Sequence, residues 1–84
     1  MDAYLIVAQS ITQAQHMQRA LWQAGVPGRI VRGHRAITPQ GCGYTVQLSA
    51  NGLAPGVEVL NREGFWPFRV YAYDGKGRYQ EVTV

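Results

Sequence analysis

The sequence repeats itself with a period of about 40 residues, and this repeat limits the folds that the chain can adopt. Tyr4 aligns with Tyr44, and residues 24–31 parallel residues 63–70 with a shift of 39 or 40. Each copy reads as a strand, a helix, a glycine that ends the helix, a proline and an arginine-containing strand. Two such βαβ halves predict an α+β, ferredoxin-like split βαβ sandwich of βαββαβ order.

The first half begins with an apolar run at residues 4–8, typical of a buried strand. Ser10 offers a helix N-cap, and Gln13 stands where a capping-box partner would lie. Gly25 is placed to end the helix, and residues 29–32 read as the second strand. Between these signals, apolar residues recur at helical spacing in one stripe: Ala14, Met17, Leu21 and Ala24.

The second half follows the same order. Residues 44–48 alternate as a strand, and Pro55 favours the first turn of a helix that ends at Glu63. Gly64 then takes the position of Gly25, and residues 68–73 form the fourth strand. Within this helix Val57 and Leu60 are expected to face inward, while Gly56 is a poor helix former.

Residues beyond the repeat add one more strand. Asp74-Gly75-Lys76-Gly77 is a hairpin signal, and residues 78–84 alternate as a fifth, edge strand. A chain of 84 residues allows one small domain and excludes a multidomain enzyme. We therefore expect a single domain over residues 1–84, with the βαββαβ core at 4–73 and the hairpin strand at 74–84.

The chain is rich in aromatic residues for so small a core. Two helices can cover only one face of the sheet, so the other face is left to solvent or to a second subunit. Two interpretations stay open: a homodimer through the sheet face or the final strand, and aromatic side chains that pack across strands. The residues concerned are Trp22, Phe65, Trp66, Tyr71, Tyr73 and Tyr79.

The single cysteine, Cys42, excludes an intrachain disulfide and any multi-cysteine metal site. It stands between Gly41 and Gly43 in a connection of 11 residues, 33–43, and long connections in small domains are often functional. Backbone N–H groups at the two glycines can form an anion nest, which favours the thiolate. Nearby cations would lower the pKa of the thiol further: Arg32, His34 and Arg35.

Three roles remain for Cys42. It can carry a group as an accessible thiolate, or serve as a small buried residue of the fold. A nucleophile–base pair with His34 would make a small enzyme, but no Asp or Glu between Asp2 and Glu58 is present to orient the imidazole. No metal-ligand spacing or phosphate-binding glycine loop occurs, so neither a metal nor a cofactor is expected.

The charge balance predicts few partners. Eight basic and five acidic residues leave a formal net charge of +3, and seven of the basic residues are arginines spread along the chain. This excess is too small to predict nucleic-acid binding. No secretory signal and no apolar run of ~20 residues is present, so we expect a cytoplasmic protein with a reduced thiol and no membrane association.

These residues resemble the selenium/sulfur carrier protein-like family of small bacterial domains over about residues 4–73. The resemblance rests on the strand Tyr4-Leu5-Ile6-Val7, the helix ending Ala24-Gly25-Val26-Pro27, the basic second strand and Cys42-Gly43 before the third strand. It implies that Cys42 carries sulfur or selenium and meets a donor or acceptor protein. Better-known sulfur-relay carriers have Cys-Pro-x-Pro at a helix N-terminus, whereas here Gly43 and Tyr44 follow Cys42.

Two hypotheses from different classes follow. In the first, the protein is a carrier or redox thiol protein, and Gly41, Gly43, His34, Arg35 and Arg32 surround the Cys42 thiolate. In the second, it is a ferredoxin-like module that dimerises and binds a partner or small ligand on its sheet, with a structural cysteine.

Overall fold

The computed structural model describes residues 3–33, 37 and 43–84. The elements follow the order βαββαββ, with one short 3-10 turn before the second helix. In chain order they are β1 Ala3–Val7, α1 Ile11–Gln23, β2 Arg29–Arg32, β3 Tyr44–Ser49, η1 Ala50–Gly52, α2 Leu53–Arg62, β4 Val70–Tyr73 and β5 Tyr79–Val82.

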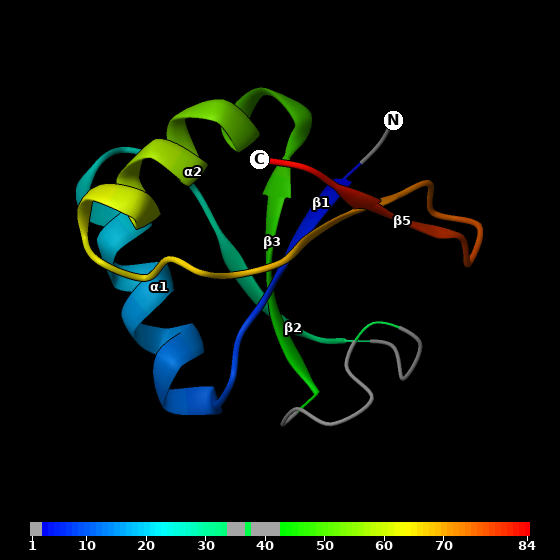
Figure 1. Cartoon of the computed structure of the whole chain (residues 1–84), viewed down its shortest axis with the longest axis horizontal. Helices are drawn as coiled ribbons and strands as arrows, with labels where there is room; N and C mark the ends of the chain where they lie inside the picture. Colours follow the sequence, from blue (N-terminus) through cyan, green and yellow to red (C-terminus); the bar gives the residue numbers. More distant parts are fainter. Residues whose placement is uncertain (1–2, 34–36, 38–42) are drawn as a thin grey trace.

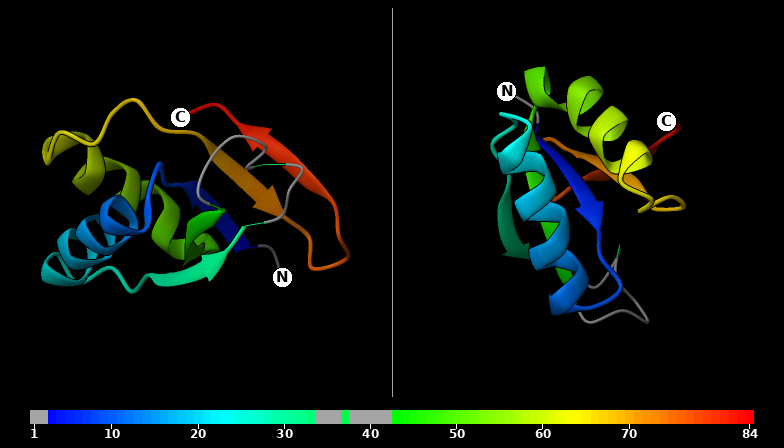
Figure 2. Two further views of the ribbon diagram at one scale, coloured as in Figure 1. Left: turned by 90° about the horizontal axis from the view of Figure 1, so that it is seen from below. Right: turned by 90° about the vertical axis from the view of Figure 1, so that its left-hand side faces the viewer.

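The strands form one five-stranded antiparallel sheet of order β2-β3-β1-β4-β5. Both helices pack on the same face of this sheet (Figure 1), and Figure 2 shows the two layers from two further sides. The first four strands have the order of a split βαβ sandwich, and β5 extends the sheet beyond β4. The ferredoxin-like fold predicted from the repeat is therefore confirmed, including the extra edge strand.

The hydrophobic core lies between the helices and the sheet. Alternate residues of the central strand β1 face the helices, because successive side chains of a strand point to opposite faces. Equivalent positions of the flanking strands and the inner stripes of both helices complete it. The buried cluster consists of Ile6, Ala8, Ala14, Met17, Leu21, Val26, Val46, Leu48, Val59, Leu60 and Val70.

Helix α1 begins at the predicted cap. The Ser10 hydroxyl accepts a hydrogen bond from the backbone N–H of Gln13 at 3.0 Å. The Gln13 side chain accepts in turn from the N–H of Gln9 at 2.7 Å, one residue before the cap itself. The bond to Ser10 satisfies one of the backbone donors at the start of the helix that have no partner within it.

Helix α1 ends in a Schellman motif. The N–H of Val26 donates to the carbonyl of Leu21 at 2.8 Å, and the N–H of Gly25 donates to that of Trp22 at 3.0 Å. Gly25 has a φ of +80°, a conformation that glycine adopts without steric cost.

Helix α2 ends in the same way, 39 residues later. The N–H of Phe65 donates to the carbonyl of Leu60 at 2.9 Å, the N–H of Gly64 donates to that of Asn61 at 3.2 Å, and Gly64 has a φ of +86°. The two halves therefore share their termination geometry as well as their element order.

Gly56 lies inside α2 because the helix packs close to the sheet. A Cβ on this residue would lie 2.8 Å from Cδ1 of Leu48 and 3.4 Å from Cδ2 of Leu21. A glycine therefore lowers the helix propensity at this position but allows the backbone of α2 to lie close to Leu48 and Leu21.

Helix α2 starts at Leu53, two residues before Pro55, because the η1 turn leads directly into it.

Several predicted boundaries and inward positions were wrong by a few residues. Ala24 is exposed, because it is the C-cap residue beyond the last turn of the stripe. In α2 Leu60 is buried as expected, but its buried valine is Val59, and Val57 is only half-buried. The fourth strand begins at Val70 and not at Phe68, and the preceding segment includes a cis Trp66–Pro67 bond.

The sheet face opposite the helices is partly covered by the chain itself. Leu5 and Thr45 point to this face, yet they are only 5% and 0% exposed. Ile37, in the connection between β2 and β3, is buried as well and is not part of the cluster under the helices. The centre of this face is therefore shielded from solvent within the chain itself.

Candidate functional site

Most of the thiol site predicted from the sequence lies outside the described residues, namely Cys42, His34, Arg35 and Gly41. The other two members, Arg32 and Gly43, are described and lie close together. If a Cβ were added to Gly43, it would be 3.8 Å from Nη1 of Arg32.

The two ends of the 33–43 connection are joined at the rim of the sheet. Arg32 pairs with Tyr44 in the β2–β3 ladder, and the N–H of Gly33 donates to the carbonyl of Gly43. Gly43 has a φ of +82°, which glycine allows at the entry to β3. The residues on either side of the connection are therefore adjacent at this rim, and Gly43 is the residue that follows Cys42 in the sequence.

The Arg32 guanidinium packs on its cross-strand neighbour. Its carbon Cζ lies 5.1 Å from the centroid of the Tyr44 ring, and Nη2 lies 3.5 Å from the Tyr44 hydroxyl. This cation–π contact orients the side chain while leaving its charge at the surface. Arg32 forms no ion pair with any described residue, so its charge is available to an anion nearby.

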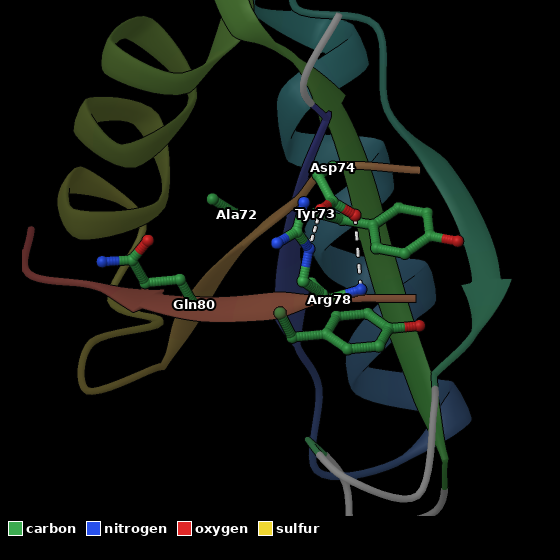
Figure 3. Close-up of a pocket in the computed structure, with 6 residues that line it drawn as sticks. Ala72, Tyr73, Asp74, Arg78 and Gln80 are labelled. Atoms are coloured by element: carbon green, nitrogen blue, oxygen red, sulfur yellow. Dashed lines mark hydrogen bonds and ion pairs between the residues drawn. The ribbon is translucent and has the colours of Figure 1, made fainter. Parts of the chain in front are cut away.

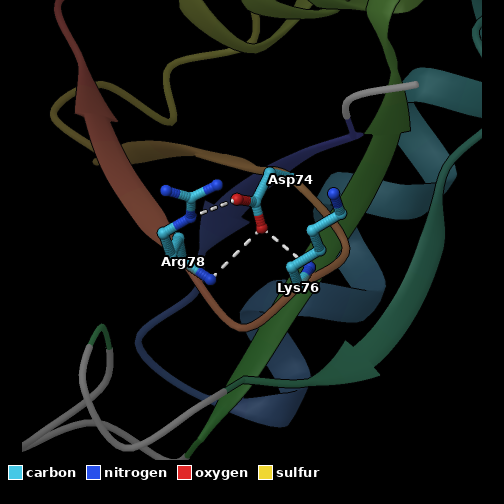
Figure 4. Close-up of polar contacts among 3 residues, drawn as sticks. All are labelled: Asp74, Lys76 and Arg78. Carbon is cyan, nitrogen blue, oxygen red and sulfur yellow. Dashed lines mark hydrogen bonds and ion pairs between the residues drawn. The ribbon is translucent and has the colours of Figure 1, made fainter.

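The β4–β5 hairpin is closed by a carboxylate (Figure 4). One Asp74 oxygen accepts the backbone N–H of Lys76 at 2.7 Å and that of Arg78 at 3.3 Å. The other accepts Nε of Arg78 at 2.7 Å. The Lys76 N–H bond is the main cause that lowers the pKa of Asp74, and burial opposes it. This carboxylate holds the turn and forms an ion pair with Arg78.

A shallow hollow lies beside this hairpin (Figure 3). Ala72 and Gln80 lie on one side of the Asp74–Arg78 pair and Tyr73 on the other. The rings of Tyr73 and Tyr79 stack at 4.8 Å between centroids and 18° between planes. Burial and then the nearby Tyr73 raise the pKa of Tyr79. The prediction that aromatic residues pack across strands is confirmed for this pair.

A third feature lies on the outer side of α1. Trp22 is 63% exposed, and its Nε1–H donates to the carbonyl of Gly28 at 3.0 Å. Gln18 donates to the same carbonyl at 2.9 Å through Nε2. A second hollow is lined by Trp22, Gln18, Gln15 and Arg19. By helical spacing, residues 15, 18, 19 and 22 share one face of α1.

The parts of the chain that the structure describes hold no group of three or more His, Cys, Asp or Glu residues able to bind a metal ion. Among the same residues, neither helix is long and apolar enough to cross a membrane. No protein-family model, curated protein or solved structure matches this chain.

Proposed function

We propose that this protein carries sulfur or selenium on Cys42, as a persulfide or selenopersulfide. The observation that supports the proposal is the position of Arg32. Its oriented guanidinium lies beside Gly43, the residue that follows Cys42, and has no carboxylate partner among the described residues. A positive charge of this kind favours a thiolate over a thiol. The resemblance to the selenium/sulfur carrier protein-like family supports the same chemistry.

The transfer is a thiol–persulfide exchange with a donor protein. The Cys42 thiolate attacks the outer sulfur of a persulfide on the donor, and a new S–S bond forms as the S–S bond of the donor breaks. The donor leaves as a thiolate, so electrons balance without an added oxidant. Passing the sulfur to an acceptor thiolate reverses these steps and regenerates Cys42.

The rate at which iodoacetamide alkylates the folded protein at different pH values tests the thiolate. We expect an apparent pKa below the free value of about 8.5. Arg32→Gln should raise that pKa by a fraction of a unit, because an exposed charge acts through water. Arg62→Gln is the matched control, an exposed arginine on another element, and should leave it unchanged. A thiol that reacts only after denaturation contradicts the proposal.

The transfer itself is tested by intact mass. After incubation with a cysteine desulfurase and cysteine, the protein should gain one sulfur atom that a reductant removes. Cys42→Ser should gain none. If the wild type gains no sulfur although its thiol is ionised, Cys42 is a reactive thiol of another kind and the carrier proposal fails.

A dimerising binding module is the second candidate, and the edge of β5 favours it. This strand pairs only with β4 among the described strands, and its Tyr79 stacks on the half-buried Tyr73 at the outer hairpin. A second copy could extend the sheet there, with Cys42 as a structural residue. Sedimentation equilibrium over a hundredfold range of concentration tests it, and a monomer throughout contradicts it.

A further inference from the structure

The outer side of helix α1 carries a stripe of four side chains at heptad spacing, the spacing by which one helix packs along another. Its members follow one another at intervals of four, three and four residues: Ile11, Gln15, Gln18 and Trp22. Both end residues are large, apolar and exposed, Ile11 at 39% and Trp22 at 63%. Helix α1 lies in the foreground of the right-hand view of Figure 2, with no other helix or strand in front of it. The stripe is therefore open to a partner molecule.

The polar groups of the stripe are oriented by the carbonyl of Gly28. This oxygen accepts Nε1–H of Trp22 at 3.0 Å and Nε2–H of Gln18 at 2.9 Å. Because a carbonyl only accepts, the Gln18 amide presents its nitrogen to Gly28, and its Oε1 is an acceptor that no described residue uses. Gln15 is exposed one turn earlier and brings two N–H donors. The middle of the stripe thus offers donors and an acceptor next to each other.

A two-fold axis through the middle of α1 maps the stripe onto itself. In an antiparallel pair of α1 helices, with the axis between residues 16 and 17, Ile11 lies opposite the Trp22 of the second copy and Gln15 lies opposite its Gln18. Each apolar end covers the other, and each Gln15 N–H can donate to the free Gln18 Oε1 across the axis. A shift by one turn would set an apolar residue against an amide, so the order of the residues selects this register.

We infer that this stripe is a dimerisation surface that binds a second copy of the chain through an antiparallel pair of α1 helices. The inference does not depend on the thiol chemistry proposed above, and the surface differs from the edge of β5. Helix α1 has 13 residues and is therefore ~20 Å long. A contact along one such helix is smaller than the ~800 Å² per partner of a stable complex. We therefore expect a weak dimer, with a dissociation constant on the order of 100 μM.

Charge favours a second copy over other occupants. The stripe itself is uncharged, and Arg19 lies to one side of it, in the hollow that Trp22 also lines. One arginine is too little to hold a polyanion, and two amides in the middle would lose their hydrogen bonds against lipid. In the antiparallel pair the two Arg19 positions lie about 7 Å apart along the helix axes, with both side chains in water. Salt screens what repulsion remains between them.

A dilution series of the ¹⁵N-labelled full chain, followed by NMR over a hundredfold range of concentration up to about 1 mM, locates the contact. The indole signal of Trp22 and the side-chain amide signals of Gln15 should shift together as the protein is concentrated. The indole of Trp66 is the internal control, because this residue is also exposed, at 53%, but lies outside α1. Signals that do not move anywhere would show a monomer and overturn the inference. So would shifts confined to Tyr79–Val82, which would locate the dimer at the edge of β5.

Sedimentation equilibrium of variants measures the contribution of the ring. Trp22→Ala should weaken the dimer by about tenfold, since a central tryptophan carries much of the binding energy of a contact. Trp66→Ala should leave the dissociation constant unchanged. An equal loss in both variants would indicate nonspecific association of exposed rings and overturn the inference.

The pairing of the amides is tested with Gln15→Glu, which sets a carboxylate against the Gln18 acceptor and should weaken the dimer by about fivefold. The fold of the monomer should not suffer, because the new carboxylate stands four residues before Arg19 on the same helix. Gln23→Glu is the matched control, since Gln23 is exposed on α1 but lies off the stripe. Circular dichroism verifies that each variant is folded.

Two further results would contradict this pairing. One is a dimer that is as tight in Gln15→Glu as in Gln23→Glu, which would leave the amides outside the contact. The other is a wild-type dimer that dissociates when salt is added, which would indicate ionic contacts. The uncharged stripe predicts a dissociation constant that salt leaves unchanged or lowers.

Discussion

The two βαβ units of this protein, β1-α1-β2 and β3-α2-β4, differ on the outside while they agree on the inside. Each helix ends in a Schellman motif 39 residues from the other, and each buries the leucine whose carbonyl accepts the closing bond, Leu21 or Leu60. On the outside, α1 has no acidic residue, whereas α2 carries Glu58 and is followed by Glu63. The two copies therefore share one scaffold, and they differ in the charges on their outer sides.

The same comparison shows where the packing of the units differs. With the shift of 39 that aligns the two motifs, the buried Met17 of α1 corresponds to Gly56 of α2. A large side chain fills the space under α1, and its absence lets α2 approach Leu48 directly. Equivalent positions can thus reach full burial through side-chain volume or through closeness of the backbone.

The largest expected loss of stability comes from truncating Leu21 and Leu60, which hold equivalent positions in the two units. Leu21→Ala and Leu60→Ala should each lower the free energy of unfolding by about 2–5 kcal/mol, because both side chains are fully buried in one core. Urea denaturation followed by circular dichroism measures the loss. If one variant loses less than about 1 kcal/mol while the other loses the full amount, the two units do not contribute equally to the core.

The next largest loss of stability is expected at Gly25 and Gly64, the glycines that end the two helices. Gly25→Ala and Gly64→Ala should each cost about 1–2 kcal/mol, since an alanine must adopt a positive φ. A Cβ meets nothing within 4 Å at either position, so backbone strain alone is measured. Gly52→Ala is the control, because Gly52 has a φ of −90° and its neighbours lie at ordinary contact distances. A loss at Gly52 as large as at Gly25 would argue against strain as the cause.

The close approach of α2 to Leu48 predicts a smaller loss of stability when Gly56 is enlarged. Gly56→Ala should lower the free energy of unfolding by about 1 kcal/mol, because overpacking against Leu48 outweighs the gain in helix propensity. Combining it with Leu48→Val should cost less than the sum of the two single changes, as the shorter side chain leaves room. Strict additivity in this double-mutant cycle would contradict the packing argument.

The smallest expected effect is a pH-dependent change in the β4–β5 hairpin, whose turn lies outside both βαβ units. The pKa of Asp74 is below its ordinary value of 3.8, so its contribution to stability is present above that pH and is lost as the pH falls through the lower folded value. The amide signals of Lys76 and Arg78 should shift together below pH 3.8 in NMR spectra, and Asp74→Asn should abolish the shift. Movement of the Val26 or Phe65 amides in the same titration would show that the change is not local.

Much of the fold could be predicted from local signals in the sequence. Ser10, Gly25 and Gly64 act through bonds to residues within one turn, so their roles could be inferred from spacing. The boundaries of the fourth strand could not, because Phe68 has strand propensity but packs against Trp66 and the core instead. The thiol site could be predicted only as a set of residues, of which Arg32 and Gly43 are described and lie together.

The sequence by itself determined the repeat, the order of the elements and the residues that end each helix, because these depend on contacts between near neighbours in the chain. Only the tertiary structure decided that Gly56 must be small, that Leu5 is covered on the side away from the helices, and that Trp22 is held by Gly28 with its ring exposed. The reason is that burial and orientation depend on groups from other elements, and the positions of those groups follow from packing.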